Sequence, residues 1–176
     1  MIGLAREAEI DPDDVRRIEI ATHQRRLRNT DTPVPQSALQ AKFSVKYVVA
    51  RALLDGSVRL KDFKEGAYAR PEVRRLLDLT TAAPLNENGP GLTGIWDAEV
   101  AVTLADGRRL ARQVEGMVGR SGDNAMSAGE LSEKFIDCTI IAVSGDRAAQ
   151  AFDALMDLEN QAEMAKVIVL LAGGAE

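Results

Sequence analysis

The clearest pattern of hydrophobic and polar positions predicts a β-hairpin near the middle of the chain. Apolar residues alternate with polar or smaller ones over Ala98–Leu104, the pair Asp106-Gly107 follows, and Arg109–Val114 can return alongside. Such alternation is typical of a half-buried strand, and Asp-Gly is a preferred turn between paired strands. Ile18–Gln24 alternates in the same way, so we expect all three segments to lie in one sheet.

A different pattern predicts a long helix over Gln36–Leu54. Hydrophobic residues occur on nearly every side of this segment, so it should be covered on both faces and should pack against the sheet. Asp55 and Gly56 follow at its end, where glycine is the usual stop signal of a helix. The polar, proline-containing segment Asn29–Pro35 before it is typical of a loop.

Three shorter segments follow the long helix. Arg70–Leu77 carries Pro71 at its start, a position at which proline favours a helix. We expect a strand over Asp78–Ala83. The segment Asn86–Gly94 is rich in glycine, asparagine and proline, which predicts a loop.

The last part of the chain has a helical pattern throughout. After a flexible connection over Gly116–Asn124, Ser127 and Glu130 have the spacing of a capping box and predict the start of a helix. Apolar residues then recur at helical spacing, with an interruption at Gly145-Asp146. The recurring residues are Leu131, Phe135, Cys138, Ala142, Phe152, Leu155, Met156, Met164, Val167, Ile168 and Leu171.

Together these elements predict an α+β fold in two parts. Residues 1–124 would form a small, mostly antiparallel sheet of about four strands with helices. Residues 125–176 would form a helical tail.

Composition and charge exclude several classes of function. The 176 residues are 45% hydrophobic and 28% charged, with a net charge of −5, as in ordinary globular proteins. This balance offers no electrostatic surface for nucleic acid or for an anionic membrane. No apolar run reaches the roughly 18 residues of a membrane span, and the chain has no signal-peptide pattern, so we expect a cytoplasmic protein.

The side chains that most often carry chemistry are sparse. Cys138 is the only cysteine and His23 the only histidine, so we expect no disulfide within the chain, no metal site and no cofactor. We interpret Cys138 as a core residue and His23 as a structural residue. Arg25, Arg26 and Arg28 form the one basic cluster, for which a solvated loop is the favoured interpretation and an anion site the alternative.

One polar strip borders the apolar face of the long predicted helix. At about 100° per residue, Gln40, Ser44, Tyr47 and Arg51 fall within roughly 60° of one another. A buried tyrosine usually finds a hydrogen-bond partner and has no further role, and periodicity alone favours this structural interpretation of Tyr47.

The segment Gln40–Gly56, QAKFSVKYVVARALLDG, resembles a signature of the MmgE/PrpD family, which includes 2-methylcitrate dehydratases and cis-aconitate decarboxylases. Members carry a helix here that reads roughly A-x-F-S-x-x-Y-x-V-A-x-A-L-x-x-G. The matching positions are Ala41, Phe43, Ser44, Tyr47, Val49, Ala50, Ala52, Leu53 and Gly56. The Asp-Gly hairpin, Gly119 and the segment Ser127–Phe135 are similar to further features of the family. The resemblance covers nearly the whole chain, but only the later part of a complete member.

The resemblance implies a fold and an activity. Members have a large helical domain and a smaller α+β lid domain, so residues 1–124 would be the lid and residues 125–176 helices that return to the helical domain. The family reaction is lyase or related chemistry on a small polycarboxylate, with no metal: proton abstraction next to a carboxylate, then loss of water or carbon dioxide, or epimerisation. Tyr47 aligns with a tyrosine that lines the active-site cleft of members. The resemblance therefore implies that Tyr47 is catalytic and that Ser44 assists in substrate binding.

The same resemblance limits what the chain is expected to do alone. Members carry an upstream segment similar to K-x-Y-P-x-C-x-x-x-H, and this sequence opens just after the place where that segment would stand. A polycarboxylate site needs several cationic and proton-transferring groups in one cleft. We therefore expect the chain to be inactive by itself, and to form a homo-oligomer or associate with a helical-domain half through the apolar stripes of its tail. The alternative function is that of a non-enzymatic α+β interaction module derived from the lid.

Overall fold

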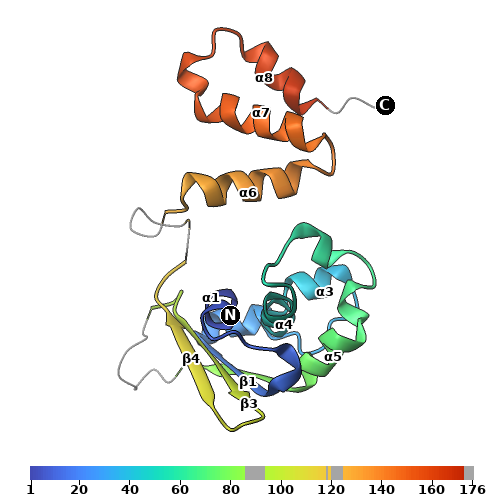
Figure 1. Ribbon diagram of the computed structural model, residues 1–176, viewed down its shortest axis with the longest axis vertical. Helices are drawn as coiled ribbons and strands as arrows, with labels where there is room; N and C mark the ends of the chain where they lie inside the picture. The colour runs from blue at the N-terminus through green and yellow to red at the C-terminus, as the bar shows by residue number, and fades with distance from the viewer. Residues whose placement is uncertain (86–93, 118, 120–124, 173–176) are drawn as a thin grey trace. The chain divides into compact units, whose positions relative to one another are not determined.

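The computed structural model describes residues 1–85, 94–117, 119 and 125–172 (Figure 1). The chain forms two compact units, Met1–Ser121 and Gly122–Glu176. Of the predicted loop Asn86–Gly94, all but Gly94 lies outside the described residues. The same holds for residues 118 and 120–124 of the predicted connection Gly116–Asn124.

The first unit contains a four-stranded mixed sheet in the order β2-β1-β3-β4. The strands are β1 (Val15–Thr22), β2 (Thr80–Pro84), β3 (Ala98–Leu104) and β4 (Arg109–Val114). β1 pairs in parallel with β2 and antiparallel with β3, and β3 pairs antiparallel with β4. The α+β class and the predicted hairpin are therefore confirmed, in a sheet with one parallel pair.

The first predicted strand extends too far along the sequence. β1 ends at Thr22, and Gln24 begins the short helix α2 (Gln24–Thr30). His23 caps this helix, since its Nδ1 accepts the backbone N–H of Arg25 at 3.1 Å. The expectation that the three neighbouring arginines lie in a loop was therefore wrong, because the histidine side chain stabilises a helical turn there.

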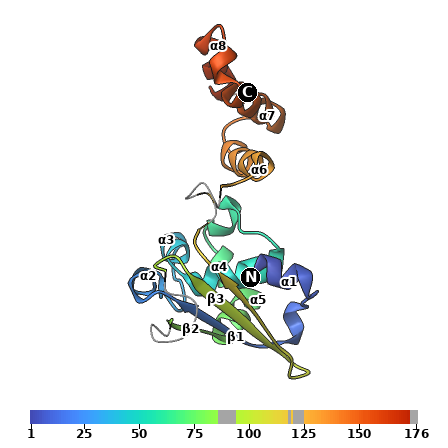
Figure 2. The same ribbon diagram turned by 90° about the vertical axis from the view of Figure 1, so that its left-hand side faces the viewer.

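Helices cover one face of the sheet, and the main core lies between the two layers. The helices α1 (Ile2–Glu7), α4 (Val45–Asp55) and α5 (Pro71–Asp78) lie on the same side of the sheet (Figures 1 and 2). Buried residues of this core include Leu4, Val15, Ile18, Ile20, Ala50, Leu53, Leu76, Val100, Val102 and Leu104. Along β3 they are alternate residues, as the period-two pattern predicts.

The predicted single helix over Gln36–Leu54 is in fact two helices, α3 (Ala38–Lys42) and α4. Ser44 lies between them in an extended conformation, and its Oγ accepts the backbone N–H of Tyr47 at 3.2 Å. Ser44 also forms an isolated β-bridge with Asp31. The continuous helix was wrong because this serine caps a new helix, a role that an apolar repeat does not reveal.

Short 3₁₀ turns lie between the longer elements. They are η1 (Pro12–Asp14), η2 (Leu60–Phe63), η3 (Ala67–Ala69) and η5 (Leu158–Asn160). The turn η2 follows α4 and brings Asp62 next to it, which matters for the site below.

The second unit contains the helices α6 (Ala128–Thr139), α7 (Gly145–Met156) and α8 (Met164–Leu171), and α7 packs against both of the others. The predicted capping box is confirmed, because Ser127 Oγ accepts the N–H of Glu130 and the Glu130 carboxylate accepts the N–H of Ser127 at 2.8 Å. The rings of Phe135 and Phe152 lie 5.6 Å apart between α6 and α7.

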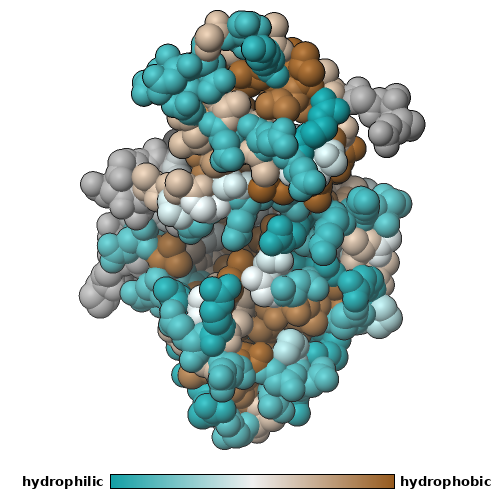
Figure 3. Space-filling view, turned by 45° about the horizontal axis from the view of Figure 1, so that its top comes forward, coloured by the Kyte–Doolittle hydropathy of each residue, from teal (hydrophilic) through white to brown (hydrophobic). Residues whose placement is uncertain are grey.

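Many large apolar side chains of the second unit are exposed, and Figure 3 shows hydrophobic surface on it. They are Leu131, Ile140, Ile141, Met156, Leu158, Met164, Ile168, Val169 and Leu171. Cys138 is also exposed, so its interpretation as a core residue was wrong. The reason is that α6 packs mainly against α7, which covers one side of the helix and leaves Cys138 uncovered. Within the described part of the chain, no helix is long and apolar enough to cross a bilayer.

Gly56 provides a test of how α4 ends. It adopts the left-handed conformation, with φ +63° and ψ 5°, and no atom lies within 4 Å of where a Cβ would stand. We expect Gly56→Ala to lower the free energy of unfolding by about 1 kcal/mol, because a Cβ disfavours this conformation. The control Gly129→Ala, in α6, also has open space but should stabilise by about 0.5 kcal/mol. Urea denaturation followed by circular dichroism measures the free energy of unfolding of both variants. Equal effects of the two substitutions would contradict the left-handed conformation of Gly56 at the end of α4.

Candidate functional site

The residues of the predicted polar strip separate into two groups. Ser44, Tyr47 and Arg51 come together at the start and middle of α4, where all three are buried. Gln40 lies on α3 and is exposed, and its Oε1 accepts the backbone N–H of Gln36 at 2.7 Å. The break between α3 and α4 therefore removes Gln40 from the cluster.

The hydroxyl of Ser44 both donates and accepts a hydrogen bond within the chain. Oγ donates to the backbone carbonyl of Thr32 at 2.5 Å and accepts the N–H of Tyr47. The residue is 1% exposed. Its hydroxyl therefore joins the start of α4 to the segment before α3, and this caps one of the otherwise unpaired N–H groups of the helix.

Tyr47 is fully buried, at 0% exposure, beside α3 and α5. Its hydroxyl donates to the backbone carbonyl of Asp62. Its ring meets that of Phe63 edge to face, with the centroids 5.8 Å apart. Burial raises the pKa of the Tyr47 phenol, so the group keeps its proton at neutral pH.

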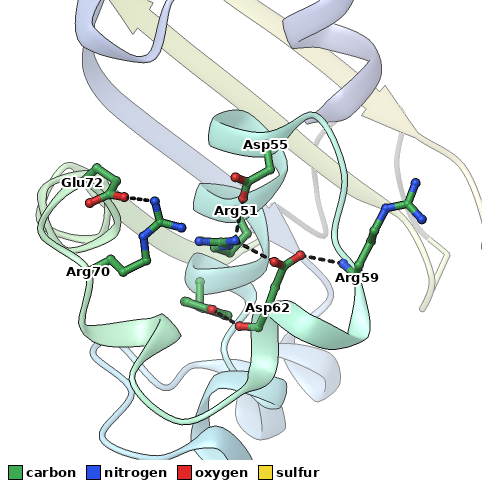
Figure 4. Close-up of polar contacts among 7 residues, drawn as sticks. Arg51, Asp55, Arg59, Asp62, Arg70 and Glu72 are labelled. Atoms are coloured by element: carbon green, nitrogen blue, oxygen red, sulfur yellow. Dashed lines mark hydrogen bonds and ion pairs between the residues drawn. The ribbon is translucent and has the colours of Figure 1, made fainter. Parts of the chain in front are cut away.

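Arg51, one helical turn after Tyr47, forms a buried ion pair with Asp62 (Figure 4). Its Nη2 lies 2.6 Å from Asp62 Oδ1 and 2.9 Å from Asp55 Oδ2. The side chains of Arg51 and Asp62 are 5% and 2% exposed. The second carboxylate oxygen of Asp62 accepts the backbone N–H of Arg59 at 2.7 Å. A buried pair of this kind is costly to desolvate, and removing one partner alone costs far more than removing both.

The guanidinium of Arg51 points towards the residues that open α5 (Figure 4). There Arg70 forms an ion pair with Glu72, on the partly exposed surface of the unit. The backbone N–H of Glu72 and the Arg70 guanidinium hold the pKa of the Glu72 carboxyl below its usual value. Two nitrogen atoms of Arg51, Nε and Nη1, have no acceptor among the described residues.

The arrangement is a closed polar cluster inside the first unit. Asp62 receives the Tyr47 hydroxyl on its backbone carbonyl and the Arg51 guanidinium on its side chain. Proton transfer from Tyr47 to a ligand would require the hydroxyl to leave the carbonyl that it now contacts. What the cluster does in the present structure is fix α4 to η2.

Asp62 was not among the residues that the sequence pattern predicted. Its partners Arg51 and Tyr47 lie 11 and 15 positions earlier in the chain, across the loop after α4. Neither helical nor strand periodicity covers such a spacing, and an aspartate in a turn is ordinarily exposed. Only its position between the apolar residues Leu60 and Phe63 could have indicated burial.

The remaining candidate residues stay apart from this cluster. His23 caps α2, Cys138 lies in the second unit, and Arg25, Arg26 and Arg28 lie on α2. In the part of the chain that the structure describes, no three His, Cys, Asp or Glu side chains are grouped as metal ligands would be.

The contacts of Asp62 lead to a stability prediction. We expect Asp62→Ala to lower the free energy of unfolding by about 3 kcal/mol or more, because Arg51 would remain buried with Asp55 alone. The control is Asp106→Ala, at the exposed hairpin turn, where the lost ion pair to Arg108 lies in water and its removal should have a much smaller effect. Urea denaturation compares the two variants, and a loss at Asp62 no larger than that at Asp106 would contradict the role of the buried pair.

Two known proteins of the same name are similar to most of this chain. The human protein named cis-aconitate decarboxylase is 26% identical over 170 residues, which cover 97% of this chain and 34% of that protein. The mouse protein of the same name is 28% identical over 109 residues, which cover 62% of this chain and 22% of that protein. The chain thus spans about a third or less of the length of these relatives.

A family model decides the assignment, since it matches far more than half of the sequence. The model describes the MmgE/PrpD C-terminal domain and matches residues 1–159. Those residues include the sheet, the buried cluster on α4 and most of the second unit. The chain belongs to the MmgE/PrpD family, as a C-terminal domain of that family.

Proposed function

We propose that this domain is part of an enzyme that acts on a small polycarboxylate in the cytoplasm. One observation carries the proposal: 97% of the chain is similar to a protein named cis-aconitate decarboxylase. The proposed chemistry is proton abstraction next to a carboxylate with loss of carbon dioxide or water, or epimerisation. Decarboxylation would break a carbon–carbon bond and release carbon dioxide. The electron pair left on the substrate carbon must then be protonated.

Tyr47 is the residue of this domain that we propose for the proton-transfer or positioning step. Its phenol is protonated at neutral pH, as a proton donor must be, and burial raises the pKa of this phenol further. To act on a substrate, the hydroxyl must exchange the carbonyl of Asp62 for a substrate oxygen or carbon. Ser44 would then act indirectly, by holding the start of α4 in place rather than by touching the substrate through a free hydroxyl.

The chain is proposed to need further groups for activity. The buried cluster on α4 includes no base–acid pair open to a ligand, and polycarboxylate chemistry needs several converging cationic groups. We therefore propose that a helical domain of the family supplies the rest of the site. By itself the chain should not turn over a polycarboxylate.

A turnover assay with cis-aconitate tests the proposal. The chain alone should be inactive, whereas a protein that joins it to a preceding helical domain of the family should release carbon dioxide or water from a tricarboxylate. In that protein, Tyr47→Phe should lower kcat by about 10²-fold if the phenol transfers a proton. The control Tyr68→Phe removes a hydroxyl that donates only to the side chain of Glu65, and should leave kcat unchanged.

Stability measurements separate the two roles of Tyr47. Loss of its buried hydrogen bond should cost about 1 kcal/mol of the free energy of unfolding in either role. An unchanged kcat per folded molecule would make Tyr47 structural. A joined protein that acts on no tricarboxylate, or a chain that is active alone, would contradict the proposed function and favour an interaction module instead.

We also propose that the exposed apolar residues of the second unit mediate association. In α8, with the sequence MAKVIVLL, only Val167 is buried. A helix that is apolar on nearly all sides normally lies in a protein interior, and a large exposed apolar surface favours association. The proposed partner is the helical domain, and a second copy of the chain takes its place when that domain is missing.

Light scattering over a range of concentrations tests the proposed association. The isolated chain should show a mass that rises with concentration, because each newly buried large apolar side chain contributes about 1.5–3 kcal/mol. Ile141→Lys, at a residue 73% exposed, should weaken the association. The control is Leu39→Lys on α3, where the leucine is 66% exposed in the first unit, and it should have no effect. A monomer at all concentrations would contradict the proposal.

A further inference from the structure

The helix α2 carries three arginines that the proposed chemistry does not use. Arg25 and Arg28 lie three positions apart, so they share one face of the helix, and both are exposed. Leu27 is buried at 8% exposure and fixes the opposite side of α2 against the unit. Like charges at this spacing destabilise a helix, so the arrangement works against the local stability of α2.

The third arginine is held in place by contacts that leave its charge unneutralised. The guanidinium carbon of Arg26 lies 4.4 Å from the centroid of the Trp96 ring, which is the geometry of a cation–π contact. Its Nη1 also contacts the sulfur of Met117 at 3.9 Å. Both partners are neutral, so Arg26 is positioned as a cation at the surface.

No carboxylate among the described residues forms an ion pair with Arg25, Arg26 or Arg28. On the sheet, by contrast, Arg109 contacts the carboxylates of Glu19 and Glu99.

Two acidic residues, one at the end of α2 and one beside Trp96, have other partners. Asp31, which follows the helix, pairs with Lys46 at 3.8 Å. Asp97, next to Trp96, accepts the backbone N–H groups of Gly94 and Gly116. Three arginines without a carboxylate partner among the described residues thus lie on one short helix, in a chain whose net charge is −5.

We propose that Arg25, Arg26 and Arg28, together with Trp96, bind small polyvalent anions with two or more carboxylate or phosphate groups. A guanidinium presents two parallel N–H donors that match either group, and a ligand with several charges can bind more than one arginine at once. This α2 anion site lies outside the α4 cluster, and it goes beyond the proposed function because binding here is measured without turnover.

Trp96 makes the proposal testable in the intact chain, because it is the only tryptophan. Its emission is recorded while cis-aconitate or inorganic phosphate is added at constant ionic strength, with acetate as the monovalent comparison. We expect a saturable change with at least one of the two polyvalent anions and none with acetate. The anion that binds more tightly shows whether the site prefers carboxylate or phosphate groups.

A double variant tests whether the arginines are responsible. Arg25→Gln with Arg28→Gln should weaken binding by about 10-fold, since two surface ion pairs are lost, and should leave the fold intact because both residues are exposed. The matched control is Arg6→Gln with Lys64→Gln, which removes the same charge from exposed positions of α1 and the segment after η2, and should bind as the original chain does.

Three results would overturn the α2 anion site. One is the absence of any saturable emission change together with no heat of binding in calorimetry. Another is an equal response to acetate, which would show that binding does not require a second charged group on the ligand. The last is an equal loss of affinity in the two double variants. A failed turnover assay contradicts only the proposed function, since none of these measurements depends on catalysis.

Discussion

The first unit depends on one residue, Asp62, that accepts hydrogen bonds through both its backbone and its side chain. The backbone carbonyl binds the Tyr47 hydroxyl, and the carboxylate binds Arg51 and the N–H of Arg59. These contacts fasten two successive turns of α4 to the segment that follows it. Because the Arg51 charge lies in the interior, where water cannot replace a missing partner, the position of η2 relative to α4 is tightly constrained. The same constraint places the ring of Tyr47 against Phe63.

This constraint also explains why one tyrosine can be interpreted in two ways. A phenol that donates to a buried carbonyl is well explained as a structural group. The same phenol is protonated at neutral pH, which a proton-transfer role would also require. The difference lies in whether the hydroxyl ever leaves the carbonyl of Asp62.

The sequence predicts those parts of the fold that short-range patterns determine. The Asp106-Gly107 hairpin and the Ser127–Glu130 capping box are confirmed, because each depends on residues within a few positions of one another. The break at Ser44 and the helix that His23 caps were missed, because a side chain that bonds the backbone ends or begins a helix without changing the apolar pattern. The buried pair of Arg51 and Asp62 was out of reach for another reason, since it joins two elements across a loop. For Cys138, periodicity gives the apolar side of α6 but does not say whether anything covers it.

The parallel pairing of β1 with β2 has a consequence for how the first unit assembles. Ile18 pairs with Thr80, so the helices α2, α3, α4 and α5 all lie within the loop that this pairing closes. The hairpin of β3 and β4 closes only a short turn. Loop closure costs entropy that grows with the length of the loop, and pairings between distant residues slow folding. The hairpin can therefore form early. By contrast, β1 can pair with β2 only after the helices between these two strands have become compact. The α4 segment, with its internal tie to Asp62, lies in the part of the chain that must order before the sheet is complete.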